Sequence, residues 1–428
     1  MAAEPVAPTR LRLIVFRFGV VYLGLFSAAT QISGSVLPNL AFYYRGLGQL
    51  WPMREITAWV GDVFGLSAGL EAGSGGEPLF VWVQTGWLLV VSAVTTIVWS
   101  MAGRRGESHP AVHAWFRLFV RFALAAALFE YGMTKVIPTQ FPPPSLTALV
   151  TPVGDLTLSA MLWASIGASP AYEIFTGCVE LLAGLLLLTP RTTLLGALIG
   201  LGAVVQVFVL NMTYDIGLKL ISFHLIVLAL VLIAPDASRL ADVFVRHRPA
   251  GIATEPAPLR SRRGNRLALA VQLAFGAYLV GMYAYINVSY WQVAGGGAPK
   301  SALYGIWNVE TLAIDGEIRA PQVNDYDRRW RRVIFDAPDA VVVQRTDDSF
   351  ARYGASIDAG RGTVALTKGG SRTWAAALRF DQPSPDRLVL DGEMDGYHIR
   401  AGLRLVELDT LRLLNSTFRW VRPHEQAQ

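Results

Sequence analysis

Seven apolar stretches of membrane-spanning length constrain this chain more than any other feature. A helix needs about 20 consecutive apolar residues to cross the hydrocarbon core of a bilayer. Stretches that approach or reach this length lie at residues 13–32, 80–101, 115–137, 174–189, 192–212, 216–234 and 267–291. Apolar residues make up 53% of the chain and charged residues only 16%, which is typical of integral membrane proteins. We therefore predict a helical membrane bundle.

The placement of arginine predicts the orientation of this bundle. Residues 10–17 contain three arginines, and residues 239–266 contain seven. Residues 138–172 and 211–217, on the opposite side, contain no Lys or Arg. Because positive charge stays on the cytoplasmic side, we expect an inner-membrane protein with a cytoplasmic N-terminus and an extracytoplasmic C-terminus. The same asymmetry explains the net charge of +5 without nucleic acid as a partner.

One alternative remains open at the end of the first stretch. The small residues Ser33, Gly34 and Ser35 are also typical of a signal-peptide cleavage region. Cleavage there would leave six spans in the same orientation.

Changes in composition divide the chain into five parts. The parts are residues 1–114 (two spans joined by an external interfacial amphipathic helix near 47–66), 115–240 (a four-helix bundle), 241–266 (a basic cytoplasmic linker), 267–292 (a seventh span) and 300–422 (a soluble domain). Short alternating segments between turn signals in the last part predict an antiparallel β-barrel or sandwich outside the membrane. The proline-rich loop that begins at Phe141 is expected to form a lid over the helix ends or a stiff spacer.

Ionisable residues gather at the outer ends of three predicted spans. Lys135 ends the third span, and Glu173, Gly177, Glu180 and Gly184 form one acidic, glycine-lined stripe on the fourth because their spacings match a helix face. Glycines in such a stripe permit a neighbouring helix to approach closely. The predicted site has His224, Glu180 and Lys135 as catalytic candidates, with Glu130, Tyr131, Glu173, Asn211, Tyr214, Asp215 and Lys219 lining a ligand pocket.

The charges of this predicted site do not balance. Four acids face two lysines, so at least one acid should hold a proton or His224 should be charged. Charges at membrane depth usually mark function. The structural alternative is that the ion pairs only lock the bundle, with Asp215 and Lys219 forming an interfacial helix pair.

The sequence gives little indication of disulfide, metal or nucleotide-cofactor chemistry. The single cysteine, Cys178, excludes an intrachain disulfide, a CxxC pair and a zinc–cysteine site. His109 and His113 lack further ligands for a metal. No flavin, haem or nucleotide motif is present, so an enzyme that works alone is not indicated.

The segment 122–236 resembles the DoxX-like membrane proteins. The resemblance rests on Tyr131-Gly132 with Lys135, on Glu180 with Gly184 before Pro190-Arg191-Thr192, and on Asn211, Tyr214-Asp215, Lys219 and His224. It implies a four-helix membrane unit at about residues 115–240. Relatives in this group include subunits of quinone-linked oxidation of reduced sulfur, and others linked to thiol redox balance or membrane export. The missing second cysteine argues against a thiol relay.

The soluble domain opens with Gly305-Ile306-Trp307, which is similar to the GxW of the first lipocalin strand. That resemblance implies that Arg419 covers Trp307 and closes one end of the barrel. A generic antiparallel β-domain is the alternative.

Two functions follow as hypotheses. In the first, the chain is a redox-linked membrane subunit in which Glu180 and Lys135 bind a quinone or another polar-headed lipid molecule, with His224 as proton carrier and a partner subunit. In the second, it is a non-catalytic carrier or scaffold whose β-barrel holds an apolar ligand or a protein partner. A plain membrane anchor is a third possibility.

Overall fold

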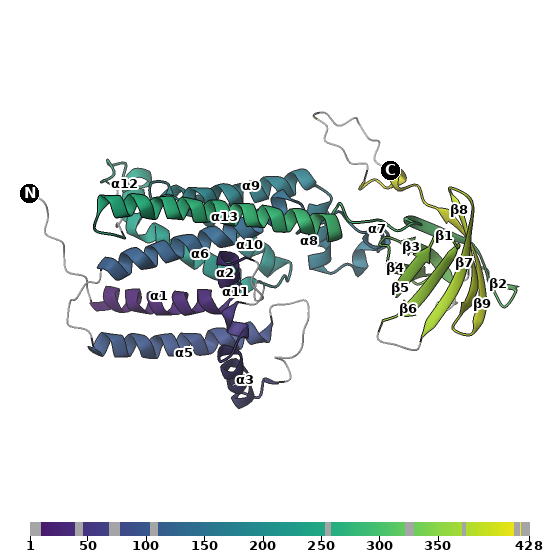
Figure 1. Ribbon diagram of the computed structural model, residues 1–428, viewed down its shortest axis with the longest axis horizontal. Helices are drawn as coiled ribbons and strands as arrows, with labels where there is room; N and C mark the ends of the chain where they lie inside the picture. Colours follow the sequence, from purple (N-terminus) through teal and green to yellow (C-terminus); the bar gives the residue numbers. More distant parts are fainter. Residues whose placement is uncertain are drawn as a thin grey trace, which may run out of the picture. The chain divides into compact units, whose positions relative to one another are not determined.

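The protein, studied as a computed structural model, comprises two compact units. The first unit is Met1–Gln140 with Ala171–Ser289, and the second is Phe141–Pro170 with Tyr290–Gln428. The structure describes residues 10–38, 46–67, 78–102, 110–252, 258–321, 329–369, 374–414 and 420. The first unit is helical, and the second combines a β-barrel with short helices (Figure 1).

Among the described residues, seven helices are long and apolar enough to cross a membrane, which confirms the predicted bundle. Six of them are α1 (Arg10–Ala29), α5 (Leu79–Ala102), α6 (Pro110–Val136), α9 (Pro170–Leu187), α10 (Thr193–Thr213) and α13 (Arg262–Ala294). The other is the continuous segment Lys219–Phe244, made of α11 (Lys219–Ile233), the 3-10 turn η3 (Ala234–Asp236) and α12 (Ala237–Phe244). Shorter elements are α2 (Gln31–Val36), α3 (Met53–Val63) and the 3-10 turn η1 (Leu47–Gln49). The chain is thus a multi-pass membrane protein in contact with a lipid bilayer.

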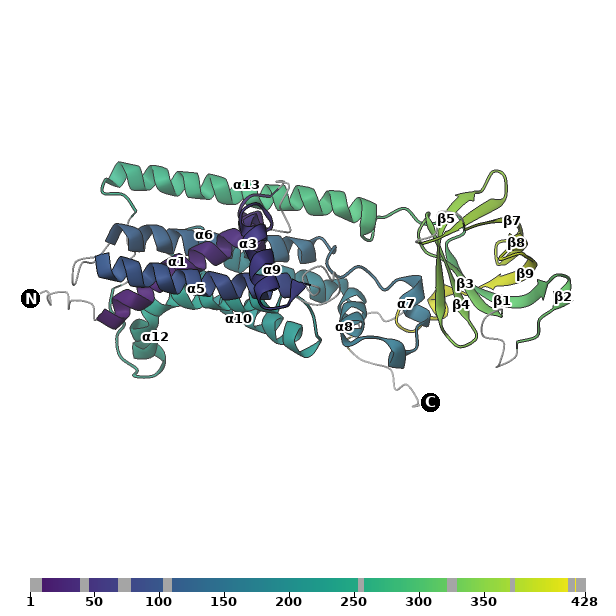
Figure 2. The ribbon, with the colours of Figure 1, turned by 90° about the horizontal axis from the view of Figure 1, so that it is seen from below.

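Helices α6 and α11 form the centre of the bundle. Their most apolar windows are 61% and 56% buried, whereas the window of α13 is only 17% buried. Small residues of α6 such as Ala123 and Ala127 are almost fully buried against the apolar core, because small side chains let helices approach closely in a membrane. Figure 2 shows α13 running along the outside of the bundle.

Helix α3 lies inside the segment predicted to be amphipathic. Its Thr57 and Gly61 are buried, whereas Trp59 and Val63 are exposed. The indole of Trp87 on α5 donates a hydrogen bond to the Thr57 hydroxyl at 3.0 Å. The charged residues Arg54, Glu55 and Asp62 are exposed as well. Apolar and charged side chains both project from α3, as in an amphipathic helix at a membrane interface.

Eight antiparallel strands of the second unit close a barrel within the described residues. The strands are β1 (Gly305–Ile314), β3 (Trp330–Phe335), β4 (Ala340–Arg345), β5 (Phe350–Asp358), β6 (Thr363–Lys368), β7 (Ala375–Ser384), β8 (Arg387–Met394) and β9 (Tyr397–Leu405), and β2 (Glu317–Ile318) extends the edge of β1. Neighbouring strands pair in chain order, and β1 pairs with β9 to close the ring. The predicted β-domain is therefore a barrel, not a sandwich.

Side chains fill the interior of this barrel. Trp307, Phe335, Leu388 and Leu403 are each at most 2% exposed and belong to one apolar cluster. Alternation along the strands explains this set, because every second residue of a strand points inward. A filled interior leaves little room for a carried ligand.

The segment that begins at Phe141 packs on the outer wall of the barrel. It forms α7 (Leu146–Val150), η2 (Val153–Asp155) and α8 (Leu158–Gly167). Leu146 contacts the outward-facing Ile306, Ile334 and Val342, and its backbone N–H donates to Asp336 at 2.9 Å. Within its unit the segment therefore covers strands, an arrangement that neither the lid nor the spacer interpretation described.

Candidate functional site

Lys135 and Glu180 form a buried ion pair between α6 and α9. The Lys135 ammonium lies 2.7 Å and 2.9 Å from the two carboxylate oxygens of Glu180, and the two side chains are only 7% and 5% exposed. Lys135 also donates to the backbone carbonyl of Tyr131 at 3.3 Å. Lys135 thus takes its charged partner from another helix.

Glycines bring the two helices together at this pair. A Cβ atom on Gly177 of α9 would lie 2.7 Å from the Gly132 carbonyl oxygen and 2.7 Å from the Lys135 Cβ. About two turns further along α9, a Cβ on Gly184 would lie 2.7 Å from the ring of Phe129. The glycines of α9 thus allow α6 to pack closely against it, as predicted. This close packing determines the register in which Glu180 faces Lys135.

Two further members of the predicted pocket contact α2, a short helix that the sequence pattern does not predict. Ser35 donates a hydrogen bond to the buried carboxylate of Glu130. One turn earlier on α2, the Gln31 amide donates to the hydroxyl of Tyr131. Ser35 and Gly34 are buried, so the segment considered as a cleavage region is here a packed part of the bundle.

Helix α13 extends this hydrogen-bonded network. The Tyr283 hydroxyl donates to the carbonyl of Ser35 at 2.7 Å, and the Asn287 amide donates to the carbonyl of Tyr283 at 2.9 Å. Thr139, just after α6, donates to Asn287 at 2.7 Å. Tyr283 and Asn287 were missed, although polar residues four apart in an apolar span are a usable signal.

Glu173 lies on the same face of α9 as Glu180 and is fully buried. With Glu130 and Glu180 it makes three buried carboxyl groups on α6 and α9. The same two helices also bury the cations of Arg117, Arg121 and Lys135. Buried charges in a membrane bundle are costly and usually mark function.

His224 has a different set of contacts. Its ring stacks on Phe26 of α1 with centroids 3.5 Å apart, and its Nδ1 lies 2.6 Å from the carbonyl oxygen of Leu220. Because a carbonyl only accepts, the neutral ring carries its proton on Nδ1, and Nε2 accepts from the Tyr22 hydroxyl at 2.7 Å. Outside its own helix, His224 thus bonds to α1, whereas Lys135 bonds to α9.

The remaining lining residues lie around the turn between α10 and α11. Asn211 donates to Ser222 at 3.2 Å, and Tyr214 ends α10. Lys219 pairs with Asp215 at 2.8 Å, but the Asp215 side chain is 84% exposed. The acid of this pair is therefore largely exposed, which leaves Asp215 outside the buried group.

The exposed pair permits a prediction about pH. The hydrogen bond and charge of Lys219 hold the pKa of Asp215 below its usual value. A lowered folded-state pKa stabilises the fold above the unfolded value of about 4, and this contribution disappears as pH falls through the folded value. Asp215→Asn should therefore lower the thermal stability slightly at neutral pH and not at all in acid. Thermal unfolding in detergent across this range measures it; an equal loss in acid would contradict it.

The barrel-closing residues are described in part. Trp307 is buried and donates through its indole to the Leu303 carbonyl at 3.0 Å. Gly305 has a φ of +150°, and a Cβ there would lie 2.4 Å from Leu405, so only glycine fits. Arg419 and His109 lie outside the described residues. Among the described residues, no group of three or more His, Cys, Asp or Glu side chains is placed to hold a metal ion.

Comparison with known proteins identifies a homologous protein. No family profile and no solved structure matches the chain. The chain is 35% identical over 137 residues to the uncharacterized protein YwoB of Bacillus subtilis (strain 168), a match that covers 31% of this chain and 82% of YwoB. Over that part of its length, the chain belongs to the same family as YwoB.

Proposed function

We propose that this chain is a redox-linked membrane subunit whose helical bundle binds the polar head of a quinone-class, lipid-soluble molecule beside Lys135 and Glu180. The observation that carries the proposal is the buried pair, with its ammonium 2.7 Å and 2.9 Å from both carboxylate oxygens inside a membrane bundle. Buried charges in membranes are costly and are usually kept for use. The DoxX-like resemblance, which includes subunits of quinone-linked oxidation, supports the same chemical class.

The residues present fit such a head group. Lys135 and the Tyr131 hydroxyl are hydrogen-bond donors suited to carbonyl oxygens, and Glu130 and Glu180 are buried carboxyls suited to hold protons. A bound quinone would supply a two-electron, two-proton acceptor. Because the ammonium already contacts Glu180, ligand binding requires Lys135 to redirect one of its three N–H donors.

His224 takes a different role in this proposal. Its two ring nitrogens are engaged by Tyr22 and Leu220. We therefore assign the direct ligand contacts to Lys135 and Glu180 and leave His224 outside the binding site, where it orders the packing of α11 against α1.

In this proposal the barrel is a docking domain. The arginine asymmetry supports a cytoplasmic N-terminus and an extracytoplasmic barrel. The lipocalin-like start of β1 supports the alternative of a ligand carrier, but the filled interior favours a barrel that binds a partner subunit with its outer surface.

The proposal predicts a bound quinone. Protein purified from its membrane in mild detergent should retain a quinone detectable by mass spectrometry of extracted small molecules. Glu180→Gln should reduce the retained amount about tenfold, because hydrogen bonds to charged groups contribute about 1.5–3 kcal/mol. Asp215→Asn is the matched control, since it removes the carboxylate of a second Lys–acid pair that is exposed, and it should retain the wild-type amount. A wild-type protein free of quinone, or equal retention in Glu180→Gln, would exclude the proposal.

A further inference from the structure

Three buried arginines lie in the first halves of α1 and α6. Arg117 donates to the carbonyl of Leu232 at 2.9 Å near the end of α11, and Arg121 donates to the side chain of Gln272. Both guanidinium groups therefore have acceptors, and a cation at a helix C-terminus is favourable. Arg17 differs from them.

Arg17 on α1 is buried without an anionic partner in the described part of the chain. It is 5% exposed, and its guanidinium lies over the ring of Trp99 on α5, 5.5 Å from the centroid. Its Nε has no hydrogen-bond acceptor. Because a buried donor without an acceptor and a buried charge without a counterion are both costly, an anion would be favourable at this position.

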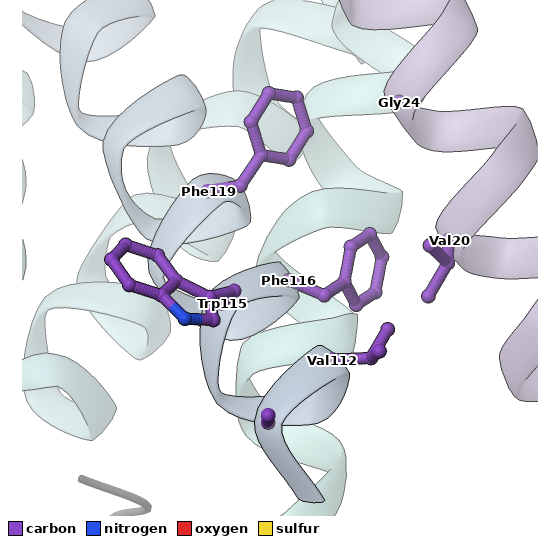
Figure 3. A pocket seen from close by; sticks show the side chains of 7 residues that line it. Val20, Gly24, Val112, Trp115, Phe116 and Phe119 are labelled. Atoms are coloured by element: carbon purple, nitrogen blue, oxygen red, sulfur yellow. The ribbon is translucent and has the colours of Figure 1, made fainter. Parts of the chain in front are cut away.

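An apolar groove begins about one turn further along α1, between α1 and the first turns of α6. Val20 and Gly24 of α1 line it together with Ala111, Val112, Trp115, Phe116 and Phe119 of α6, and its volume is about 440 Å³. Figure 3 shows the rings of Trp115, Phe116 and Phe119 around the space that Val20 borders. This volume lies within the roughly 300–1,000 Å³ of small-molecule sites.

The arginine and the groove share one side of α1. Arg17, Val20 and Gly24 recur at spacings of three and four residues and so form one stripe on the helix. A Cβ atom on Gly24 would meet no atom within 4 Å, so the groove is open there. Along the axis of α1, Arg17 is therefore followed by the groove residues Val20 and Gly24.

We propose that this groove is a binding site for an anionic phospholipid. The phosphate accepts hydrogen bonds from Arg17, and one acyl chain lies along Val20, Gly24 and the aromatic residues of α6. Charge complementarity selects this occupant: basic residues near the membrane surface attract anionic lipids, and the groove itself offers only apolar contacts. The site is independent of the quinone proposal, because it involves neither Lys135 nor Glu180.

Lipid selectivity tests the headgroup contact. Full-length protein in detergent is incubated with equal amounts of phosphatidylglycerol and phosphatidylcholine, and bound lipid is counted by native mass spectrometry. Wild-type protein should prefer phosphatidylglycerol, and Arg17→Gln should lower the preference about fivefold, as expected for one basic residue near the surface. Arg17→Lys should restore most of it. Arg12→Gln, which removes an exposed arginine of the same helix, should leave the preference unchanged.

Filling the groove tests the acyl-chain contact. Gly24→Leu should lower the number of retained lipids of both kinds, whereas Gly19→Leu, at an open glycine of α1 that does not line the groove, should not. Absence of any preference in the wild type, an equal effect of Arg12→Gln, or full retention in Gly24→Leu would each overturn the proposal.

Discussion

Replacing Lys135 with methionine should destabilise the helical bundle by about 3–5 kcal/mol, the typical loss when one partner of a buried ion pair is removed. The variant leaves the Glu180 carboxylate at about 5% exposure without its counterion, and an uncompensated charge in a low-dielectric environment is costly. Unfolding of the detergent-solubilised protein, followed by circular dichroism, measures the loss.

Two matched variants separate charge from packing. Adding Glu180→Leu to Lys135→Met replaces both charges with apolar groups and should recover most of the lost stability. Lys219→Met removes the same ammonium from a pair whose acid is 84% exposed and should have little effect, because exposed pairs contribute little. If the double variant is as unstable as Lys135→Met, or if Lys219→Met is equally damaging, the burial of the charge is not the cause.

Local patterns in the sequence predicted much of this architecture. Apolar length alone places the seven membrane-spanning helices, because hydrophobic runs are local. Alternation and turn residues likewise predicted a closed or layered β-domain. The Lys135–Glu180 pair was predictable because two charges in apolar spans stand out, and the glycine at position 177 indicated a close helix contact.

The surroundings of that pair were not predictable in the same way. Gln31 and Ser35 lie in a helix of six residues, too short to give a periodic pattern, and small polar residues after an apolar run also suggest a cleavage region. His224 was grouped with Glu180 because both lie at a similar depth. Depth does not determine the direction of a side chain, and His224 bonds to Tyr22 on α1. Such contacts depend on which helices are neighbours, and a single sequence does not reveal the neighbours of each helix.

Gly177→Leu should separate α6 from α9 and disrupt the ion pair without changing a charge. Its first added atom would lie 2.7 Å from the Gly132 oxygen and 2.8 Å from the Val136 nitrogen. Both are backbone atoms, so the helices themselves must move. Overpacking of this kind costs about 1–3 kcal/mol or more, and the loss of the Lys135–Glu180 contact adds to it. We expect a lower unfolding midpoint and, under the proposed function, loss of the retained quinone.

Substitutions at two other glycines are controls for this prediction. Gly132→Ala should be milder, since its Cβ would meet the Gly177 oxygen and Leu181 at 3.0 Å. Gly202→Leu on α10 should be harmless, because a Cβ there meets nothing within 4 Å and the residue is exposed, where leucine favours the helix over glycine. If the glycine contact positions the pair, Gly177→Ala and the double replacement of Lys135 and Glu180 should also be non-additive. Additive losses would mean that the close approach of the helices and the ion pair stabilise the bundle independently, and that the glycines do not position Glu180 for Lys135.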